Sequence, residues 1–295
     1  MHPYFLLILL FLTGFRQTDP KIETLKSEIE EYLSEQEGTY AVWFQDLQDE
    51  DQHFAINEDT LFHAASTMKT PVMIELFKRV EAGELSLDDS IKVENKFYSI
   101  VDGSEFQMTI SPESNDPIEK KVGEKATIRE LNHAMITYSS NLATNILIKL
   151  VGAEETTQTM RELGAMNIQV LRGVEDLKAF ERGLSNRTTA KDLGIILEHL
   201  ANGTAVNPEM DQQMIEVLQD QYYRDIVPAK LPEDVIVANK TGSITGVEHD
   251  SAVVYLPDGS SYILIFLSKD LPDNEKGREI GAKISRMVYE FIASE

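Results

Sequence analysis

The sequence predicts an α+β fold in which the two ends of the chain build one antiparallel sheet with flanking helices, while the middle forms an all-α lobe. Runs of β-branched and aromatic residues occur near both ends of the chain. Between about residues 61 and 200, apolar residues instead recur at helical spacing. We therefore assign an α/β lobe to about residues 19–60 and 225–295 and an all-α lobe to about residues 61–224, together forming one domain over 19–295.

The N-terminal part of this domain is expected to contribute one helix and two strands. The helix is indicated by four apolar residues at helical spacing, namely Ile22, Leu25, Ile29 and Leu33. Residues 39–44 (TYAVWF) are rich in β-branched and aromatic side chains, which predicts a strand. A second short strand is predicted at residues 53–56, after an acidic turn.

The C-terminal part is expected to contribute three strands and a last helix. The strands are predicted at residues 235–238, 251–256 and 261–267, and Pro257-Asp258-Gly259 supplies a turn between the last two. The helix carries one apolar stripe, made of Ile280, Ile284, Met287 and Phe291.

Ahead of the domain, residues 4–15 (YFLLILLFLTGF) are almost uninterruptedly apolar, and we predict that residues 1–18 are approximately a signal peptide. The run is shorter than the roughly 20 residues that a membrane-spanning helix needs. A buried N-terminal helix is the alternative, because no Lys or Arg precedes the run and no clean small-x-small cleavage site follows it. We expect an exported protein, either periplasmic or secreted.

The composition excludes several classes of protein. The chain has no cysteine, which rules out thiolate zinc sites, iron–sulfur clusters, cysteine nucleophiles, disulfides and lipid attachment through an N-terminal cysteine. Its net charge is −23, and an acidic chain without a basic run is a poor partner for nucleic acid. The six histidines show no metal-ligand spacing, and GxSxG, HExxH, P-loop and GxGxxG motifs are absent. We expect no metal ion and no cofactor.

A Ser-x-x-Lys motif opens one of the predicted helices. Ser66-Thr67-Met68-Lys69 precedes an apolar run, and Pro71 is tolerated only within about the first turn, so the helix starts close to Ser66. A step of three residues places Lys69 on the same helix face as Ser66. The hydroxyl would then lie at a helix N-terminus, where free N–H groups favour developing negative charge.

Two further motifs lie at element boundaries. Ser139 and Asn141 come just before an apolar helix that ends at Gly152, so their side chains can project into a cleft. Lys240-Thr241-Gly242-Ser243 directly follows the strand at 235–238. Taken alone, Ser139 is more often a helix N-cap and Lys240 a charge at a strand end. All three motifs together, in this order, favour a catalytic site.

The order SxxK, SxN and KTG resembles that of the class A β-lactamases and penicillin-binding proteins. The segments FHAASTMK, TIRELNHAMITYSSNLATNILI and VANKTGSITGVEHDSAVVYLP are similar to class A enzymes, and SIVDGSEF at residues 99–106 is similar to a class A-like subgroup of serine hydrolases. The resemblance covers about residues 22–292. It implies a β-lactamase/transpeptidase-like fold and a hydrolase that acts on cyclic amides.

The resemblance also implies a role for each motif. Ser66 would be the nucleophile that forms an acyl-enzyme, and Lys69 its base, provided that burial and the nearby Lys240 lower the pKa of Lys69 enough to make it neutral. Ser139 would relay a proton to the leaving nitrogen. The backbone N–H groups of Ser66 and Ser243 would form an oxyanion hole. Substrate binding would fall to Asn141, Lys240, Thr241, Gly242 and Ser243.

One loop departs from the class A pattern. Class A enzymes carry the carboxylate that activates the deacylating water in a loop of the form Arg-x-Glu-x-x-Leu-Asn, whereas residues 172–178 here are RGVEDLK. Val174 stands where the Glu is expected, Glu175 comes one position late and Lys178 replaces the Asn. Glu175 is the candidate for the missing carboxylate, with Asp176 as the other possibility.

Two more departures accompany this one, and three functions stay open. Arg172 lacks its acidic partner late in the loop, where Arg187 occurs instead, and Ser140 stands where an Asp is usual. The first function is a β-lactamase acting on a small β-lactam. The second is a penicillin-binding or peptidase-like acyl transferase that acts on a cell-wall peptide and deacylates slowly. The third is a non-catalytic sensor of β-lactam or peptide. We expect a monomer.

Overall fold

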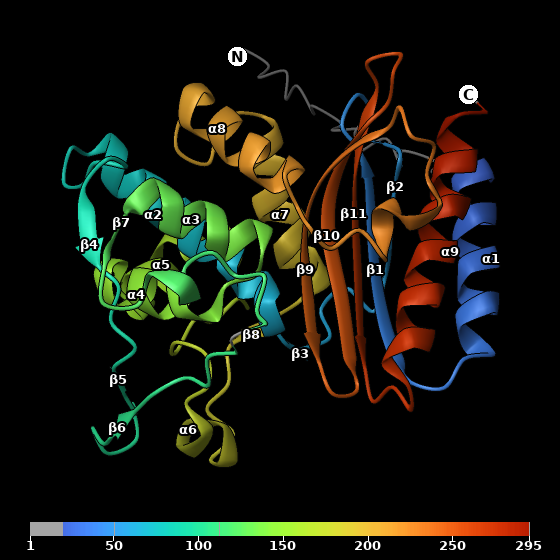
Figure 1. Cartoon of the computed structure of the whole chain (residues 1–295). Coiled ribbons are helices and arrows are strands. Elements are labelled where there is room, and N and C mark those ends of the chain that lie inside the picture. Colours follow the sequence, from blue (N-terminus) through green and yellow to red (C-terminus); the bar gives the residue numbers. More distant parts are fainter. Residues whose placement is uncertain (1–19, 50, 112, 295) are drawn as a thin grey trace, which may run out of the picture.

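The two ends of the chain meet in one five-stranded antiparallel sheet with the order β2-β1-β11-β10-β9 (Figure 1). The structure is a computed structural model that describes residues 20–49, 51–111 and 113–294, so the predicted signal peptide lies outside the described residues. The strands are β1 (Thr39–Asp46), β2 (His53–Ile56), β9 (Ile236–Ile244), β10 (Val247–Tyr255) and β11 (Ser261–Lys269). The predicted α+β fold, with a sheet built from both termini, is confirmed.

One face of the sheet is covered by the first and the last described helix. Figure 1 shows α1 (Pro20–Ser34) and α9 (Asn274–Ile292) side by side on this face. The predicted stripe of α1 is buried, and in α9 Ile280 and Ile284 are buried while Met287 and Phe291 pack partly exposed against the same cluster. Burial of apolar surface on this face therefore ties the N-terminal helix to the C-terminal one.

The other face of the sheet packs against the helices of the middle segment. α7 (Ala190–Ala201) lies on β1 and β11, and a single buried cluster joins the sheet residues Ala41, Ile263 and Ile265 to the helices. The remaining helices here are α2 (Lys69–Glu81), α3 (Ile128–Thr137), α4 (Asn141–Val151), α5 (Ala153–Glu162), α6 (Leu177–Glu181) and α8 (Pro208–Gln219).

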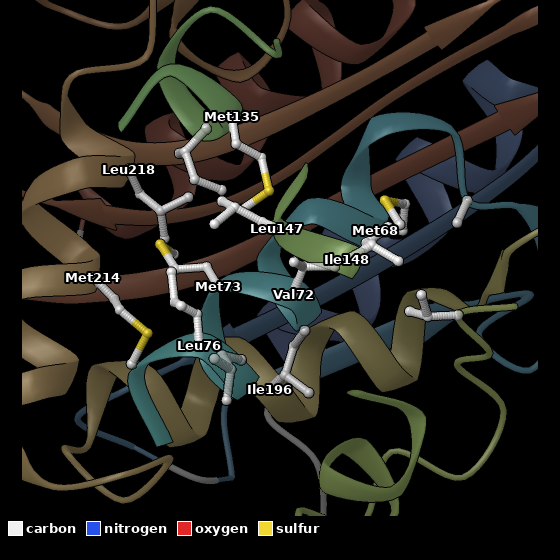
Figure 2. Packing of buried hydrophobic residues seen from close by; sticks show 14 of the residues in the cluster. Met68, Val72, Met73, Leu76, Met135, Leu147, Ile148, Ile196, Met214 and Leu218 are labelled. Atoms are coloured by element: carbon white, nitrogen blue, oxygen red, sulfur yellow. The ribbon is translucent and has the colours of Figure 1, made fainter. Parts of the chain in front are cut away.

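Helix α2 lies in the middle of this packing and is buried along most of its length. Figure 2 shows Val72, Met73 and Leu76 of α2 among side chains from neighbouring helices. Those neighbours include Met135 of α3, Leu147 and Ile148 of α4, Ile196 of α7, and Met214 and Leu218 of α8. Because interiors are close-packed, a helix that is packed on several sides holds the side chains of its first residues in fixed positions.

The middle segment also contains three short antiparallel pairs that the sequence did not indicate. They are β3 (Phe62–His63) with β8 (Arg187–Thr188), β4 (Ser90–Lys92) with β7 (Lys125–Thr127), and β5 (Phe97–Tyr98) with β6 (Glu105–Phe106). Strands of two or three residues are too short to show an alternating pattern. Within the described ranges, no helix combines the length and the apolar character needed to cross a membrane.

The strand predicted at residues 235–238 is longer than expected. β9 runs to Ile244, so Lys240, Thr241, Gly242 and Ser243 lie inside a strand rather than after it, and the prediction was wrong on this point. The polar motif gave no strand signal, but pairing with β10 extends the ladder through it, with Ser251 opposite Lys240 and Ser243 opposite Glu248. Because β9 is the last strand in the sheet order, only one of its edges pairs with another strand of this sheet. The turn that contains Ser66 packs against β9.

Candidate active site

Ser66 lies in a 3₁₀ turn, η1 (Ala65–Met68), that leads directly into α2. The predicted helix start is therefore close to the observed one, but the turn before Lys69 is tighter than an α-helix. Ala65 has a φ of 44°, a left-handed conformation that is strained for a residue with a side chain. A Cβ at Gly242 would lie 3.1 Å from the backbone N of Ser66, so glycine allows β9 to pass this close to the turn.

Lys69 is the first residue of α2, three residues after Ser66, and its side chain is fully buried. Its Nζ donates to Ser139 O at 2.7 Å, to Asn141 Oδ1 at 2.9 Å and to Ser139 Oγ at 3.0 Å. Burial lowers the pKa of Lys69 well below its usual value, and the nearby Lys240 lowers it further, while Asp116 and Glu175 oppose the shift. Donating all three hydrogen bonds at once requires the charged ammonium. The neutral amine, which the lowered pKa favours, keeps two N–H groups and has a lone pair with which to accept a proton, as a general base must.

The Ser139 hydroxyl bridges the two lysines of the site. Lys69 Nζ donates to its Oγ at 3.0 Å and Lys240 Nζ donates to it at 3.2 Å. A serine hydroxyl has two acceptor lone pairs and one proton, so two incoming hydrogen bonds leave that proton free to be donated. The helix N-cap is the neighbouring residue instead, because Ser140 Oγ accepts from the N–H of Ala143. Ser139 therefore has a proton to donate.

Lys240 is also fully buried, and its Nζ donates to the carbonyl of Thr241 at 2.9 Å as well as to Ser139. Burial lowers the pKa of Lys240 to about 7, although Asp250 on the paired strand opposes the shift. Burial in turn raises the pKa of Asp250 to about 6, against hydrogen bonds from Asn239 and Val227 that favour its charged form. Burial thus favours the neutral form of Lys240.

Glu175 is brought to the site by Asn141. Asn141 Nδ2 donates to Glu175 Oε1 at 2.9 Å, while Oδ1 of the same amide accepts from Lys69. Glu175, Asn141 and Ser66 line one cavity of about 430 Å³. Glu175 has a φ of 62°, so this carboxylate reaches the cavity through a left-handed backbone. The structure therefore puts a carboxylate on the wall of the cavity that Ser66 lines, from a position one residue later than the class A pattern.

Asn145 fixes the backbone just before Glu175. Its Oδ1 accepts from the N–H of Val174 at 2.7 Å, and its Nδ2 donates to the carbonyl of Val174 at 3.0 Å. A Cβ at Gly173 would lie 2.3 Å from Asn145 Oδ1, so this approach requires glycine there. Asn145 was not singled out from the sequence. Its position four residues after Asn141, and so on the same face of α4, is the signal that could have found it.

Asp176, the other candidate carboxylate, also lines this cavity, but its carboxylate is engaged in structural hydrogen bonds. Asp176 is buried, caps α6 at Ala179 and accepts from Ser99 Oγ at 2.8 Å and from the N–H of Ile100 at 2.9 Å. Lys178 Nζ donates to Asp102 Oδ2 at 2.8 Å. Of the two candidate carboxylates, only Glu175 has its side chain paired with another residue of the Ser66 site.

Arg172 is held by carbonyl groups rather than by a carboxylate. It donates from Nε to Leu184 O and from Nη1 to Gly173 O, both at 2.8 Å. Burial lowers the pKa of Arg172, and Asp176 opposes the shift. Arg187, which occupies the place expected for an acidic partner, instead pairs through its backbone with His63 and Gln169. The loop from residue 172 to 184 is thus closed by the Arg172 side chain, which donates to a main-chain carbonyl at its far end.

The predicted substrate-binding strand has one hydroxyl engaged elsewhere. Ser243 Oγ donates to Glu248 Oε1 at 2.8 Å, and Glu248 in turn forms an ion pair with Arg278 of α9. Thr241 is almost buried next to Lys240. The cavity wall includes residues that the sequence did not single out, among them His63, Phe180, Asn186, Ile244 and Thr245. They come from four separate segments, so no local motif could have indicated them.

Fold and geometry together define a class of protein. It has an α+β domain with a serine at the entry of a buried helix, two buried lysines and a second serine hydroxyl between them, a set suited to forming and breaking an acyl-serine bond. The chain belongs to the class A β-lactamase family, since the model described as "Beta-lactamase enzyme family" matches residues 24–292.

Individual relatives are distant but cover most of the chain. The protein is similar to a β-lactamase of Rhodobacter capsulatus, with 28% identity over 242 residues that cover 79% of this chain and 78% of the relative. It is 24% identical to β-lactamase PSE-4 of Pseudomonas aeruginosa over 250 residues, 83% of this chain and 82% of the relative. Among solved structures it is similar to PBP-A, with 26% identity, a TM-score of 0.80 and coverage of 92% and 97%. A PBP-A variant was solved as an acyl-enzyme complex with penicillin G.

Proposed function

We propose that the protein is a serine hydrolase of the class A β-lactamase type that opens the β-lactam amide through a Ser66 acyl-enzyme. The observation that carries this proposal is the hydrogen bond from Asn141 to Glu175, because it holds a carboxylate on the wall of the cavity that Ser66 also lines. The nucleophile and a base for the hydrolytic water then share one space.

Acylation would use the two lysines and the bridging hydroxyl. Neutral Lys69 takes the proton of Ser66, whose Oγ forms a bond to the β-lactam carbonyl carbon. The N–H groups of Ser66 and Ser243 would stabilise the oxyanion, and one such donor is typically worth about 3 kcal/mol. When the C–N bond breaks, the nitrogen takes the free proton of Ser139, which is replaced by a proton from the neighbouring lysines.

Deacylation would depend on Glu175. Its carboxylate takes a proton from a water molecule, and the water oxygen attacks the ester carbonyl. The acyl–oxygen bond to Ser66 then breaks as Glu175 passes that proton to the Ser66 oxygen. Asn141 holds Oε1 of this carboxylate, which leaves Oε2 to face the water. The products are free enzyme and the ring-opened acid.

A single experiment tests the proposed function. Purified protein is mixed with penicillin G and followed by intact mass, and in parallel with a chromogenic cephalosporin. We expect turnover at about 1 s⁻¹ or faster, in the usual range for enzymes, with rapid return to the free mass. An adduct that persists for minutes would instead support the slowly deacylating acyl transferase or the sensor. The absence of both adduct and product would contradict the proposal.

A slowly deacylating acyl transferase with a cell-wall peptide as substrate is the second candidate. Val174 occupies the position of the carboxylate that class A enzymes use, and Glu175 reaches the cavity only through a left-handed backbone. PBP-A, to which this chain is also similar, was captured in a variant as a penicillin acyl-enzyme. The lifetime of the adduct separates this candidate from the first.

The charge of Lys240 predicts a pH dependence of substrate binding. With a pKa of about 7, Lys240 is charged below that pH and neutral above it. KM for a penicillin, which carries a carboxylate, should therefore rise about tenfold as the pH rises through the pKa of Lys240, since a hydrogen bond between charged groups is lost. A methyl ester of the same penicillin is the control and should show no such rise. Equal profiles for acid and ester would remove Lys240 from carboxylate binding.

We also propose that residues 1–18 direct export and are removed. Support comes from the apolar run at residues 4–15 alone. N-terminal sequencing of protein produced in a bacterial host with an export pathway should begin near residue 19, whereas an intact Met1 in exported protein would contradict cleavage.

A further inference from the structure

The loop that presents Glu175 is attached to a hairpin that takes no part in the proposed chemistry. The hairpin joins β5 to β6 and is closed by its own backbone, since Ser99 N donates to Ser104 O and Gly103 N donates to Ser99 O, each at 2.9 Å. Ser99 is only 5% exposed although it belongs to a surface turn. A buried polar side chain in such a turn needs a partner.

That partner is the carboxylate of Asp176. Asp176 Oδ1 accepts from Ser99 Oγ at 2.8 Å and Oδ2 accepts from the N–H of Ile100 at 2.9 Å, while Oδ1 also caps α6 at Ala179. Asp176 is only 3% exposed, so these hydrogen bonds replace those that water would make to its carboxylate. The hairpin and the loop are thus joined at a buried, charge-assisted contact.

A second, exposed contact joins the same two segments. Lys178 Nζ donates to Asp102 Oδ2 at 2.8 Å and to Ser104 Oγ at 2.7 Å. The hydrogen bond from Lys178 holds the pKa of Asp102 below its usual range. Because both groups are solvent-exposed, this contact is worth less than the buried one.

These contacts bear on Glu175 because of its backbone. Glu175 is left-handed, with a φ of 62°, and such a conformation persists in a residue with a side chain only where its surroundings enforce it. Asn145 holds Val174 on one side of it, and the hairpin holds Asp176 on the other. The conformation that aims Glu175 at the cavity is therefore fixed from both sides.

We propose that Ser99 and Asp176 are positioning residues for Glu175, and that the hairpin at residues 97–106 sets the rate of deacylation without touching the substrate. This inference rests on the proposed function, in which Glu175 activates the hydrolytic water. Acylation depends on Ser66, Lys69 and Ser139, none of which contacts the hairpin through a hydrogen bond in the described part of the chain. The contact between Ser99 and Asp176, here called the clamp, should thus affect deacylation and leave acylation unchanged.

Ser99→Ala tests the clamp by steady-state kinetics with penicillin G. Loss of the Ser99 hydroxyl should slow deacylation about tenfold, in line with one lost hydrogen bond to a charged group. In a two-step mechanism, slower deacylation lowers kcat and KM together and leaves kcat/KM, which reports acylation, unchanged. A merely structural effect that reduces the folded fraction would lower kcat and kcat/KM equally, and that result would overturn the proposal.

Two control variants accompany it. Ser99→Thr keeps the hydroxyl and should keep most of the wild-type kcat. Ser285→Ala removes an equally buried hydroxyl, which donates to Val227 O at 2.7 Å on the far side of the sheet, and should leave kcat unchanged. If Ser285→Ala lowers kcat as much as Ser99→Ala does, the effect is general destabilisation and the clamp is refuted.

Hydrogen exchange of the free protein separates this inference from the proposed function. In Ser99→Ala, amides of residues 173–180 should exchange faster than in wild type, while those of α2 should not change. Unchanged exchange in the loop would refute the clamp whatever the substrate is. Faster exchange in a protein that penicillin never acylates would support the mechanical contact, refute its link to deacylation and contradict the proposed function.

Discussion

Replacing Ser66 by Ala is expected to abolish the penicillin adduct and to lower turnover by at least about 10⁴-fold, since removing the nucleophile of an acyl-enzyme mechanism leaves only binding and oxyanion stabilisation. Ser66 is partly exposed, so the variant should fold as the wild type does. Intact mass after incubation with penicillin G gives the answer directly. An adduct on Ser66→Ala would show that another residue is the nucleophile.

The folding control for this variant is thermal unfolding. Loss of one partly exposed hydroxyl should change the free energy of unfolding by less than about 1 kcal/mol. If Ser66→Ala were both unfolded and unreactive, its loss of reactivity could come from the lost fold or from the lost nucleophile. Ser66→Cys is therefore made alongside it. Its thiol should still form an adduct, because a thiolate is a nucleophile. An unreactive Ser66→Cys that keeps the wild-type melting temperature would contradict the assignment.

Replacing Glu175 by Gln is expected to trap the acyl-enzyme. The amide keeps an oxygen that can accept from Asn141 Nδ2, so the loop keeps its contact, but the amide cannot take a proton from water. General base catalysis typically contributes 10²–10⁴-fold, and deacylation should slow by about that factor while acylation continues. The measurement is the half-life of the penicillin adduct by intact mass.

Glu181→Gln is the matched control, because it makes the same chemical change at an exposed position of α6, six residues along the same loop. It should turn over substrate at the wild-type rate. If Glu175→Gln also deacylates at that rate, Glu175 is not the base. The slow-acyl-transferase function would then be favoured if the wild-type adduct is itself long-lived.

The residues to which we assign acylation could be found in the sequence because each belongs to a short motif at an element boundary. Ser66 and Lys69 are three residues apart at a helix start, and the structure puts the Lys69 amine against the predicted Ser139. Lys240, which was expected near Lys69, also donates to Ser139 Oγ. Sequence spacing translates into geometry here because a helix start and a strand have fixed rises per residue.

The conformations that complete the site could not be predicted in the same way. Ala65, Ser139 and Glu175 all have positive φ values, although none is a glycine or an asparagine. Nothing in these side chains favours the left-handed region, so the surrounding fold imposes it. The contact between Ser99 and Asp176 joins segments 77 residues apart and left no local pattern either. Tertiary structure, rather than propensity, places Glu175.

The pairing of β1 with β11 has a consequence for biosynthesis. Val42 of β1 lies opposite Phe266 of β11. The chain therefore makes roughly two hundred further residues after β1 before β11 is available to pair with it. Closing so long a loop is entropically costly, and such non-local pairing slows folding. A nascent chain that lacks its last three strands has only the β1–β2 pair of the sheet, and an isolated two-stranded pair is marginally stable at best. We therefore expect the sheet to form only when translation is nearly complete. Truncation before β11 should therefore yield an aggregation-prone polypeptide rather than a smaller working domain.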